Sequence, residues 1–163
     1  MIRESDVFAV PDQLTLGTGV DGLVMMTNWV EVFFQDYAET FRSKSRDRLL
    51  AKFCLPLTFL TRNGPVAFND EERLAANLDA LMRRYEQIEA VDWNYTIRNV
   101  RVIGSGIHLV EIEWRFFNAD NELLYTCDTS YFLAGEAGAK VMAIIAHNEN
   151  EEYERALNRK RGV

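Results

Sequence analysis

The chain has 163 residues, of which 48% are hydrophobic and 26% are charged, and its formal net charge is −7 at pH 7. This balance predicts one globular domain with a substantial core and excludes wholesale disorder. The negative charge argues against a nucleic-acid partner, because phosphate binding depends on clustered Lys and Arg side chains.

The two cysteines, Cys54 and Cys127, form neither a disulfide framework nor a Cys/His pattern with zinc spacing. We therefore expect reduced thiols, no metal site and no cofactor. The N-terminus lacks a signal sequence, and the longest apolar run is far shorter than the roughly 20 residues of a membrane span. These features predict a cytoplasmic protein with no membrane partner.

Residues 1–20 show no sustained period and are interrupted by Pro11, Gly17 and Gly19, which predicts an N-terminal arm. From Asp21 onward, apolar residues recur at steps of three and four, which predicts a long amphipathic helix to about Ser43. The buried stripe of that helix comprises Leu23, Met26, Val30, Phe33, Phe34, Tyr37 and Phe41.

A short helix and a hairpin are predicted next. Ser45 can cap a helix over residues 46–53, which Pro56 prevents from continuing. Two strands, residues 57–61 and 65–68, follow and flank an Asn-Gly pair at positions 63 and 64. That pair is a strong hairpin signal, because both residues tolerate positive φ.

The next predicted element is a helix that ends near Ala90. Asn69 and Glu72 have the spacing of a capping box at its start. The spacing of its apolar residues predicts a buried stripe of Leu74, Leu78, Leu81, Met82, Tyr85 and Ile88.

After Val91 the period changes to two, which predicts strands separated by short turns and therefore an antiparallel meander. The four strands are residues 92–103, 108–118, 123–134 and 139–148. The last strand, containing VMAIIA, is apolar on both faces. This composition predicts a central strand with both surfaces covered, and a dry outer face beside it suggests a second copy of the chain as partner.

Alternation assigns His108, Val110, Ile112, Trp114 and Phe116 to the core face of the strand 108–118. If the turn after it pairs Asn118 with Leu123, the aromatic faces of the two strands coincide. The expected cross-strand pairs are Trp114 with Cys127, Phe116 with Tyr125, and Val110 with Tyr131.

The same register places Glu113 opposite Asp128, with Arg115 and Glu111 on the same face. These charges are either a carboxylate pair with separated pKa values or the half-solvated back of the sheet. We favour the back of the sheet, with Arg115 bridging the like charges, because the helices must cover the opposite face. A register slip of one residue would reverse this assignment.

The C-terminal residues 155–163 are basic and follow the acidic stretch 148–154. We interpret them as a solvated helix end, where cations are favoured by the helix dipole. The predicted domain therefore spans residues 21–154, with a basic tail after it.

From about residue 22 to 154, the chain resembles the NTF2-like superfamily, in its SnoaL-like and ketosteroid-isomerase-like branch. The resemblance rests on the order of the elements and on the stretches LTFLTRNGPVAFNDEERLAANL (57–78) and AKVMAIIAHNENEEYERAL (139–157). It implies a cone-shaped α+β barrel, in which a curved, mixed or antiparallel sheet wraps around the long N-terminal helix and encloses a pocket. It also implies that the last strand lies between the first hairpin and the preceding strand, and that the outer sheet face forms a homodimer.

Isomerase-like members of this superfamily place a tyrosine near the end of the first helix, a carboxylate base on the early hairpin and a second acid on a late strand. Tyr37 matches the tyrosine. The hairpin carries no Asp or Glu before Asp70, so the family's base is missing from it. Asp128 matches the late-strand acid only if its side chain turns inward, against the alternation.

The histidines are the natural substitutes for the missing base. His147 ends the last strand, and it reaches the pocket rim if its parity with Val141 is inward. We therefore name Tyr37 and His147 as candidate catalytic residues, against the alternative that His147 is structural or solvated. His108 lies on the core face beside the GSG turn, where a sheet edge would leave it solvated.

The ligand-binding candidates are the aromatic residues expected to face the pocket. They are Phe33, Phe41, Phe53, Trp93, Tyr95, Trp114, Tyr125 and Tyr131. The alternative is that these rings only fill the core. Cys127 has no histidine arranged to activate it, so we interpret it as a small core residue.

Three classes of function follow. The first is binding of a hydrophobic small molecule, with cofactor-free isomerase, cyclase or dehydratase chemistry. The second is a non-catalytic interaction or scaffold module that uses the outer sheet face. The third is the small subunit of an oxygenase assembly. The sequence alone leaves open whether the protein is an enzyme.

Overall fold

The computed structural model describes the backbone of residues 20–135 and 138–162, and side chains from residue 28 onward within these ranges. Residues 1–19, which make up nearly all of the predicted arm, lie outside the described residues, as do the side chains of Leu23 and Met26.

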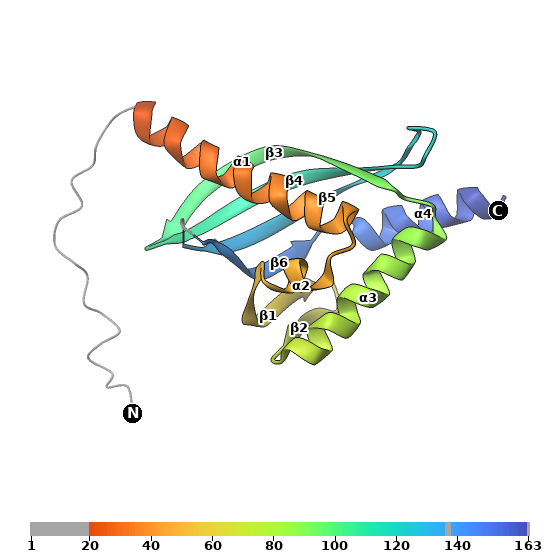
Figure 1. The fold of residues 1–163 in the computed structure, drawn as a ribbon, viewed down its shortest axis with the longest axis horizontal. Helices are drawn as coiled ribbons and strands as arrows, with labels where there is room; N and C mark the ends of the chain where they lie inside the picture. Colours follow the sequence, from red (N-terminus) through yellow and green to blue (C-terminus); the bar gives the residue numbers. More distant parts are fainter. Residues whose placement is uncertain (1–19, 136–137, 163) are drawn as a thin grey trace.

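The element order follows the sequence prediction (Figure 1). The elements are α1 (Val20–Arg42), α2 (Arg46–Leu50), β1 (Phe53–Thr61), β2 (Gly64–Phe68), α3 (Glu71–Gln87), β3 (Asp92–Gly104), β4 (Ile107–Phe117), β5 (Leu123–Ala134), β6 (Lys140–Ala146) and α4 (Glu149–Arg161).

The six strands form one curved sheet in the order β2-β1-β6-β5-β4-β3. Only β1 and β6 pair in parallel, and the other neighbouring pairs are antiparallel. The prediction that the last strand is central is confirmed, since β6 lies between β1 and β5. The sheet does not close into a barrel, because β2 and β3 remain its two edges.

Helix α1 lies across the concave face of the sheet, and α3 and α4 lie near one end of it (Figure 1). Phe34 of α1 is fully buried, and its ring centroid lies 5.0 Å from that of Tyr131 on β5. Burying a side chain of this size contributes about 2 to 3 kcal/mol. The described part of the predicted stripe, from Val30 to Phe41, therefore packs the helix against the sheet.

The predicted register of β4 and β5 is confirmed for Trp114 with Cys127, Phe116 with Tyr125, Val110 with Tyr131 and Glu113 with Asp128. The turn is different from the prediction, because Phe117 rather than Asn118 pairs with Leu123 across a bulge. Asn118 instead closes the loop with its side chain, whose Oδ1 accepts bonds from the backbone N–H groups of Asp120 and Glu122.

Three local predictions around the hairpin need correction. The helix predicted over residues 46–53 ends at Leu50, because Phe53 already pairs with Val141 in the sheet. The hairpin loop is residues 62–63, and Gly64, with a φ of 109°, opens β2. The cap of α3 is Asp70, one residue later than predicted, and its Oδ1 accepts a 2.9 Å bond from the backbone N–H of Arg73.

The charged residues of β4 and β5 lie on the outer face of the sheet, as predicted, but Arg115 does not bridge Glu113 and Asp128. A bulge between Ile97 and Asn99 places Arg98 beside Glu113, and those two form the ion pair. Arg115 donates instead to Thr96 Oγ1 at 2.8 Å. Arg98, the extra residue in the edge strand β3, is therefore the cation that pairs with Glu113, a role predicted for Arg115.

Helix α4 crosses the predicted end of the domain at residue 154 and continues through the basic segment. Acidic residues occupy its first turn and Arg159, Lys160 and Arg161 its last, which confirms the interpretation of that segment as a helix end. Gly162 closes the helix in the left-handed conformation, with a φ of 73°.

Candidate functional site

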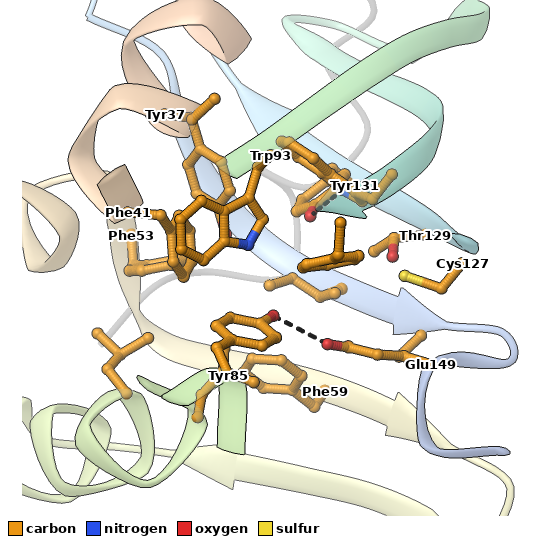
Figure 2. Close-up of a pocket in the computed structure, with 17 residues that line it drawn as sticks. Tyr37, Phe41, Phe53, Phe59, Tyr85, Trp93, Cys127, Thr129, Tyr131 and Glu149 are labelled. Carbon is orange, nitrogen blue, oxygen red and sulfur yellow. Dashed lines mark hydrogen bonds between the residues drawn. The ribbon is translucent and has the colours of Figure 1, made fainter. Parts of the chain in front are cut away.

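A cavity of about 60 Å³ lies between α1, α3 and the concave face of the sheet (Figure 2). Its lining residues are Tyr37, Ala38, Phe41, Phe53, Phe59, Leu78, Leu81, Tyr85, Trp93, Trp114, Phe116, Cys127, Thr129, Tyr131, Ile144, Ala146 and Glu149. The lining is apolar and aromatic, with a small number of polar atoms. Such a composition is typical of sites that bind small organic molecules.

The aromatic rings fill most of the space inside the cone. Tyr37 packs edge-on against Phe41 at a centroid distance of 5.2 Å, and Tyr85 packs edge-on against Trp93 at 5.6 Å. A ligand of this cavity is therefore either small or makes room by displacing rings.

Glu149 is the only ionisable carboxyl group among the described residues that line the cavity. The residue as a whole is half-buried, and its carboxyl group is the end that lies inside the protein. The hydroxyl of Tyr85 donates a hydrogen bond to its Oε1 at 2.9 Å, and Figure 2 shows this pair at one side of the cavity. Tyr85 comes from α3 and Glu149 from the first turn of α4, so the pair joins two helices at the site.

Burial raises the pKa of Glu149, because removal from water disfavours the charged carboxylate. The hydrogen bond from Tyr85 and the charge of Arg84 oppose this effect, but burial is the largest cause. The raised pKa means that this carboxyl group holds a proton more readily than an exposed glutamate does. A buried carboxyl group with this property is a candidate general acid or base.

The local fold explains how Glu149 enters the cavity. Ala146 at the end of β6 lines the cavity, the chain bends at residues 147–148, and α4 then starts at Glu149. Within α4, Tyr153, Ala156 and Leu157 are buried, and Glu149 shares their face because it precedes Tyr153 by four residues.

Glu149 is not among the predicted site residues, because the acidic stretch 148–154 was interpreted only as the segment that precedes a solvated helix end. The spacing of Glu149, Tyr153 and Leu157 was the signal that could have placed this one acid on a buried helix face. Tyr85 was correctly predicted to be buried, but its role beside an acid was not.

Tyr37 lines the cavity, as predicted, beside a buried hydrogen bond. Trp114 Nε1 donates to the hydroxyl of Tyr131 at 2.9 Å, and the ring of Tyr131 packs edge-on against that of Tyr37 at a centroid distance of 5.7 Å. Burial raises the pKa of Tyr37, so its hydroxyl stays protonated at neutral pH. Tyr37 can therefore act in this cavity as a hydrogen-bond donor.

Five of the predicted ligand-binding residues line the cavity, namely Phe41, Phe53, Trp93, Trp114 and Tyr131. The other three do not. Tyr95 bonds with Glu31 at the rim of α1, and Tyr125 stacks on Phe116 at a centroid distance of 4.3 Å. Phe33 faces a separate surface hollow beside Lys52.

His147 lies on the outer face of the sheet, away from the cavity and from Tyr37. Its Nε2 lies 2.8 Å from Oγ of Ser130, beside a surface hollow that Asp128 also lines. The reason is a bulge at Met142, which reverses the parity of β6, so that Val141 and then Ile144 face inward. The sequence-based expectation that His147 reaches the pocket rim is therefore wrong.

The other reactive candidates are buried. His108 is 2% exposed and packs edge-on against Trp29, so it is not solvated at a sheet edge. Burial raises the pKa of the Cys127 thiol, which keeps it protonated and is consistent with a core residue.

Among the residues that the structure describes, no group of three or more His, Cys, Asp or Glu side chains is arranged to hold a metal ion. In the same part of the chain, no helix combines the length and apolar character needed to cross a membrane.

A protein family described as NTF2-like protein (DUF6841) matches residues 27–149, which is most of the chain and includes both members of the Tyr85–Glu149 pair. The chain belongs to this NTF2-like family. The predicted superfamily and the α+β fold are thus confirmed. No curated protein matches the chain.

Solved structures share the NTF2-like fold at low sequence identity. Aln2 from a Streptomyces species is 14% identical, with a TM-score of 0.59 over 84% of this chain and 98% of its own. An NTF2-like protein of unknown function from Shewanella oneidensis is 13% identical, with a TM-score of 0.56 over 74% and 97%. A ketosteroid isomerase-like protein from Erwinia carotovora atroseptica is 12% identical, with a TM-score of 0.53 over 72% and 92%.

Proposed function

We propose that this NTF2-like protein binds a small, largely apolar organic molecule in the aromatic cavity and that Glu149 transfers a proton to or from it. The observation that carries the proposal is the buried Glu149 carboxyl group, held by Tyr85 in a cavity otherwise lined by apolar and hydroxyl-bearing side chains. The reaction class is isomerisation, cyclisation or dehydration without a cofactor.

The chemistry needs no external oxidant or reductant. The Glu149 carboxylate accepts a proton from the ligand, and the carboxylic acid so formed returns it to another atom of the same molecule, or to a departing hydroxyl group that leaves as water. Tyr85 donates to the carboxylate and stabilises its charged form. Tyr37 keeps its predicted place in the site as a hydroxyl donor, and Glu149 takes the place of His147.

Proton transfer is tested by NMR in D₂O with a panel of small ketones, enones and hydroxy compounds. We expect at least one compound to incorporate deuterium or lose water in the presence of the protein. The variant Glu149→Gln should slow this reaction at least about 100-fold, as is usual for loss of a general acid or base.

The matched control for this test is Glu154→Gln, which removes an exposed carboxyl group from the same helix and should leave the rate unchanged. Equal rates for the protein and for Glu149→Gln would contradict the proposal, as would a complete absence of turnover across the panel.

A second candidate function is protein interaction through the outer sheet face, with a second copy of the chain as the partner. The supporting observation is a run of half-buried or exposed apolar side chains across neighbouring strands, formed by Leu109, Phe132, Ala143, Ile145 and Leu60. Leu60 is the most exposed of these five residues, with 39% of its surface accessible to solvent. Sedimentation equilibrium should give a dimer for the native chain and a monomer for Phe132→Glu, whereas a native monomer would rule out this interface.

A further inference from the structure

The indole N–H of Trp93 is a buried hydrogen-bond donor to which the structure gives no acceptor. Trp93 is 5% exposed and lines the cavity, and Figure 2 shows its nitrogen directed toward the middle of the cavity. The great majority of buried polar atoms in native proteins have a partner, so an orphaned donor in a cavity is a sign of a missing acceptor.

The surroundings of Trp93 do not supply this acceptor. Its neighbours are aromatic rings, with centroids of Tyr85 at 5.6 Å, Phe116 at 6.3 Å and Phe41 at 6.4 Å. The hydroxyl of Tyr85 donates to Glu149, and no hydrogen bond joins its oxygen to Nε1 of Trp93. An acceptor for Trp93 must therefore come from a molecule inside the cavity.

The chemistry of indole limits what that molecule can be. The Trp side chain donates one hydrogen bond and accepts none. A ligand atom beside Nε1 must be an acceptor, and ammonium groups and hydrocarbons do not provide one. The polarised oxygen of a carbonyl group does, and Glu149 lines the same cavity as Trp93.

We propose that the cavity is specific for small carbonyl compounds, whose oxygen accepts the Trp93 Nε1–H while the rest of the molecule lies among the aromatic rings near Glu149. This inference rests on the proposed function, since it names the substrate class of the same cavity. Trp93 then determines specificity, and Glu149 carries the proton.

The test compares two probes of nearly equal shape, cyclopentanone and methylenecyclopentane, in which a carbonyl oxygen is replaced by a CH₂ group. The Nε1–H resonances of Trp29, Trp93 and Trp114 are followed in ¹⁵N-labelled protein, and that of Trp93 is assigned by its loss in Trp93→Phe. We expect cyclopentanone to shift the Trp93 Nε1–H signal downfield, and methylenecyclopentane to give no such shift.

Affinities of the variants provide a second readout. Trp93→Phe keeps a ring but removes the N–H, so it should weaken cyclopentanone binding about fivefold, the effect of one net hydrogen bond, and leave methylenecyclopentane binding unchanged. The control is Trp29→Phe, because Trp29 Nε1 is also buried without a partner but does not line this cavity. This control should bind both probes like the native protein.

The outcomes separate the two proposals. If both probes bind, and neither the Trp93 signal nor the Trp93→Phe affinities distinguish them, carbonyl specificity is wrong while ligand binding by the cavity stands. If neither probe causes any change in residues that line the cavity, the proposed function fails and this inference fails with it.

Discussion

The hydroxyl of Tyr85 donates a 2.9 Å hydrogen bond to Oε1 of Glu149, across 64 positions of the sequence. This contact joins the last turn of α3 to the first turn of α4 and fixes a carboxyl group inside an aromatic cavity. The carboxyl group that lines the cavity is therefore supplied by the last helix, whereas the superfamily resemblance implies a carboxylate on the early hairpin.

The first prediction concerns the pH dependence of stability. Burial raises the pKa of Glu149 above its ordinary value of 4.5, so the folded protein binds this proton more tightly than the unfolded chain does. The contribution of this group to the free energy of unfolding is therefore greatest below the ordinary pKa and is lost as pH rises through the raised pKa. Glu149→Gln has no ionisable group at this position, so its stability lacks this contribution to the pH dependence.

Urea denaturation at several pH values from about 4 to about 9 measures this effect. The unfolding free energy of Glu149→Gln minus that of the native protein should increase as pH rises from the ordinary pKa of the carboxyl group through the raised one. Above the raised pKa the difference should be constant. Glu154→Gln should show no comparable change. A difference that is independent of pH for Glu149→Gln would mean that its pKa is not raised.

Tyr131→Phe tests the buried hydrogen bond between Trp114 and Tyr131, which lies beside Tyr37. The substitution leaves Trp114 Nε1 buried without its acceptor, which should lower the free energy of unfolding by about 1 to 3 kcal/mol. The control is Tyr95→Phe. The hydroxyl of Tyr95 donates to the exposed Glu31, so its removal should lower the free energy of unfolding less. Equal losses in thermal or urea denaturation of the two variants would show that the buried bond contributes nothing special.

Asp70→Ala tests the start of α3. Its carboxylate accepts the Arg73 N–H, so its removal should destabilise the protein by about 1 kcal/mol. Asn69→Ala should have little effect, since Asn69 precedes the cap. If Asn69→Ala lowered the urea midpoint more than Asp70→Ala did, the capping box predicted from the sequence, with Asn69 as the cap, would be correct.

His147→Ala tests the assignment of that histidine to the outer face. It removes the contact with Ser130, which lies on the far side of the sheet from the cavity. Binding of cyclopentanone, followed through the Trp93 Nε1–H signal, should therefore be unchanged. A change in affinity of tenfold or more would show that His147 acts on the cavity after all.

Much of the fold could be predicted from the sequence, because alternation and helical spacing are local signals. The alternation with a period of two places Trp114 on the core face of its strand, and the short turn that follows sets the register that pairs it with Cys127. The bulges at Arg98 and Met142 could not be predicted in this way, because the alternation of side chains gives no sign of the one extra residue that each contains.

The errors at the site have the same physical origin. One extra residue at Met142 reverses the parity of β6, and this alone moves His147 from the expected pocket rim to the outer face. Glu149 was not predicted as a site residue, because the acidic stretch 148–154 was considered only together with the basic helix end that follows it. Its placement four residues before the buried Tyr153 shows that helix periodicity overrides the charge of the side chain.

The most direct test of the central claim is a ¹³C NMR titration of the Glu149 carboxyl group in the native protein and in Tyr85→Phe, assigned with Glu149→Gln. We predict a pKa above the ordinary 4.5 in the native protein. A higher pKa is expected in Tyr85→Phe, because the variant loses the bond that stabilises the charged form. A carboxyl group that titrates at its ordinary value in both proteins would contradict the assignment of Glu149 as the buried acid–base group of this cavity.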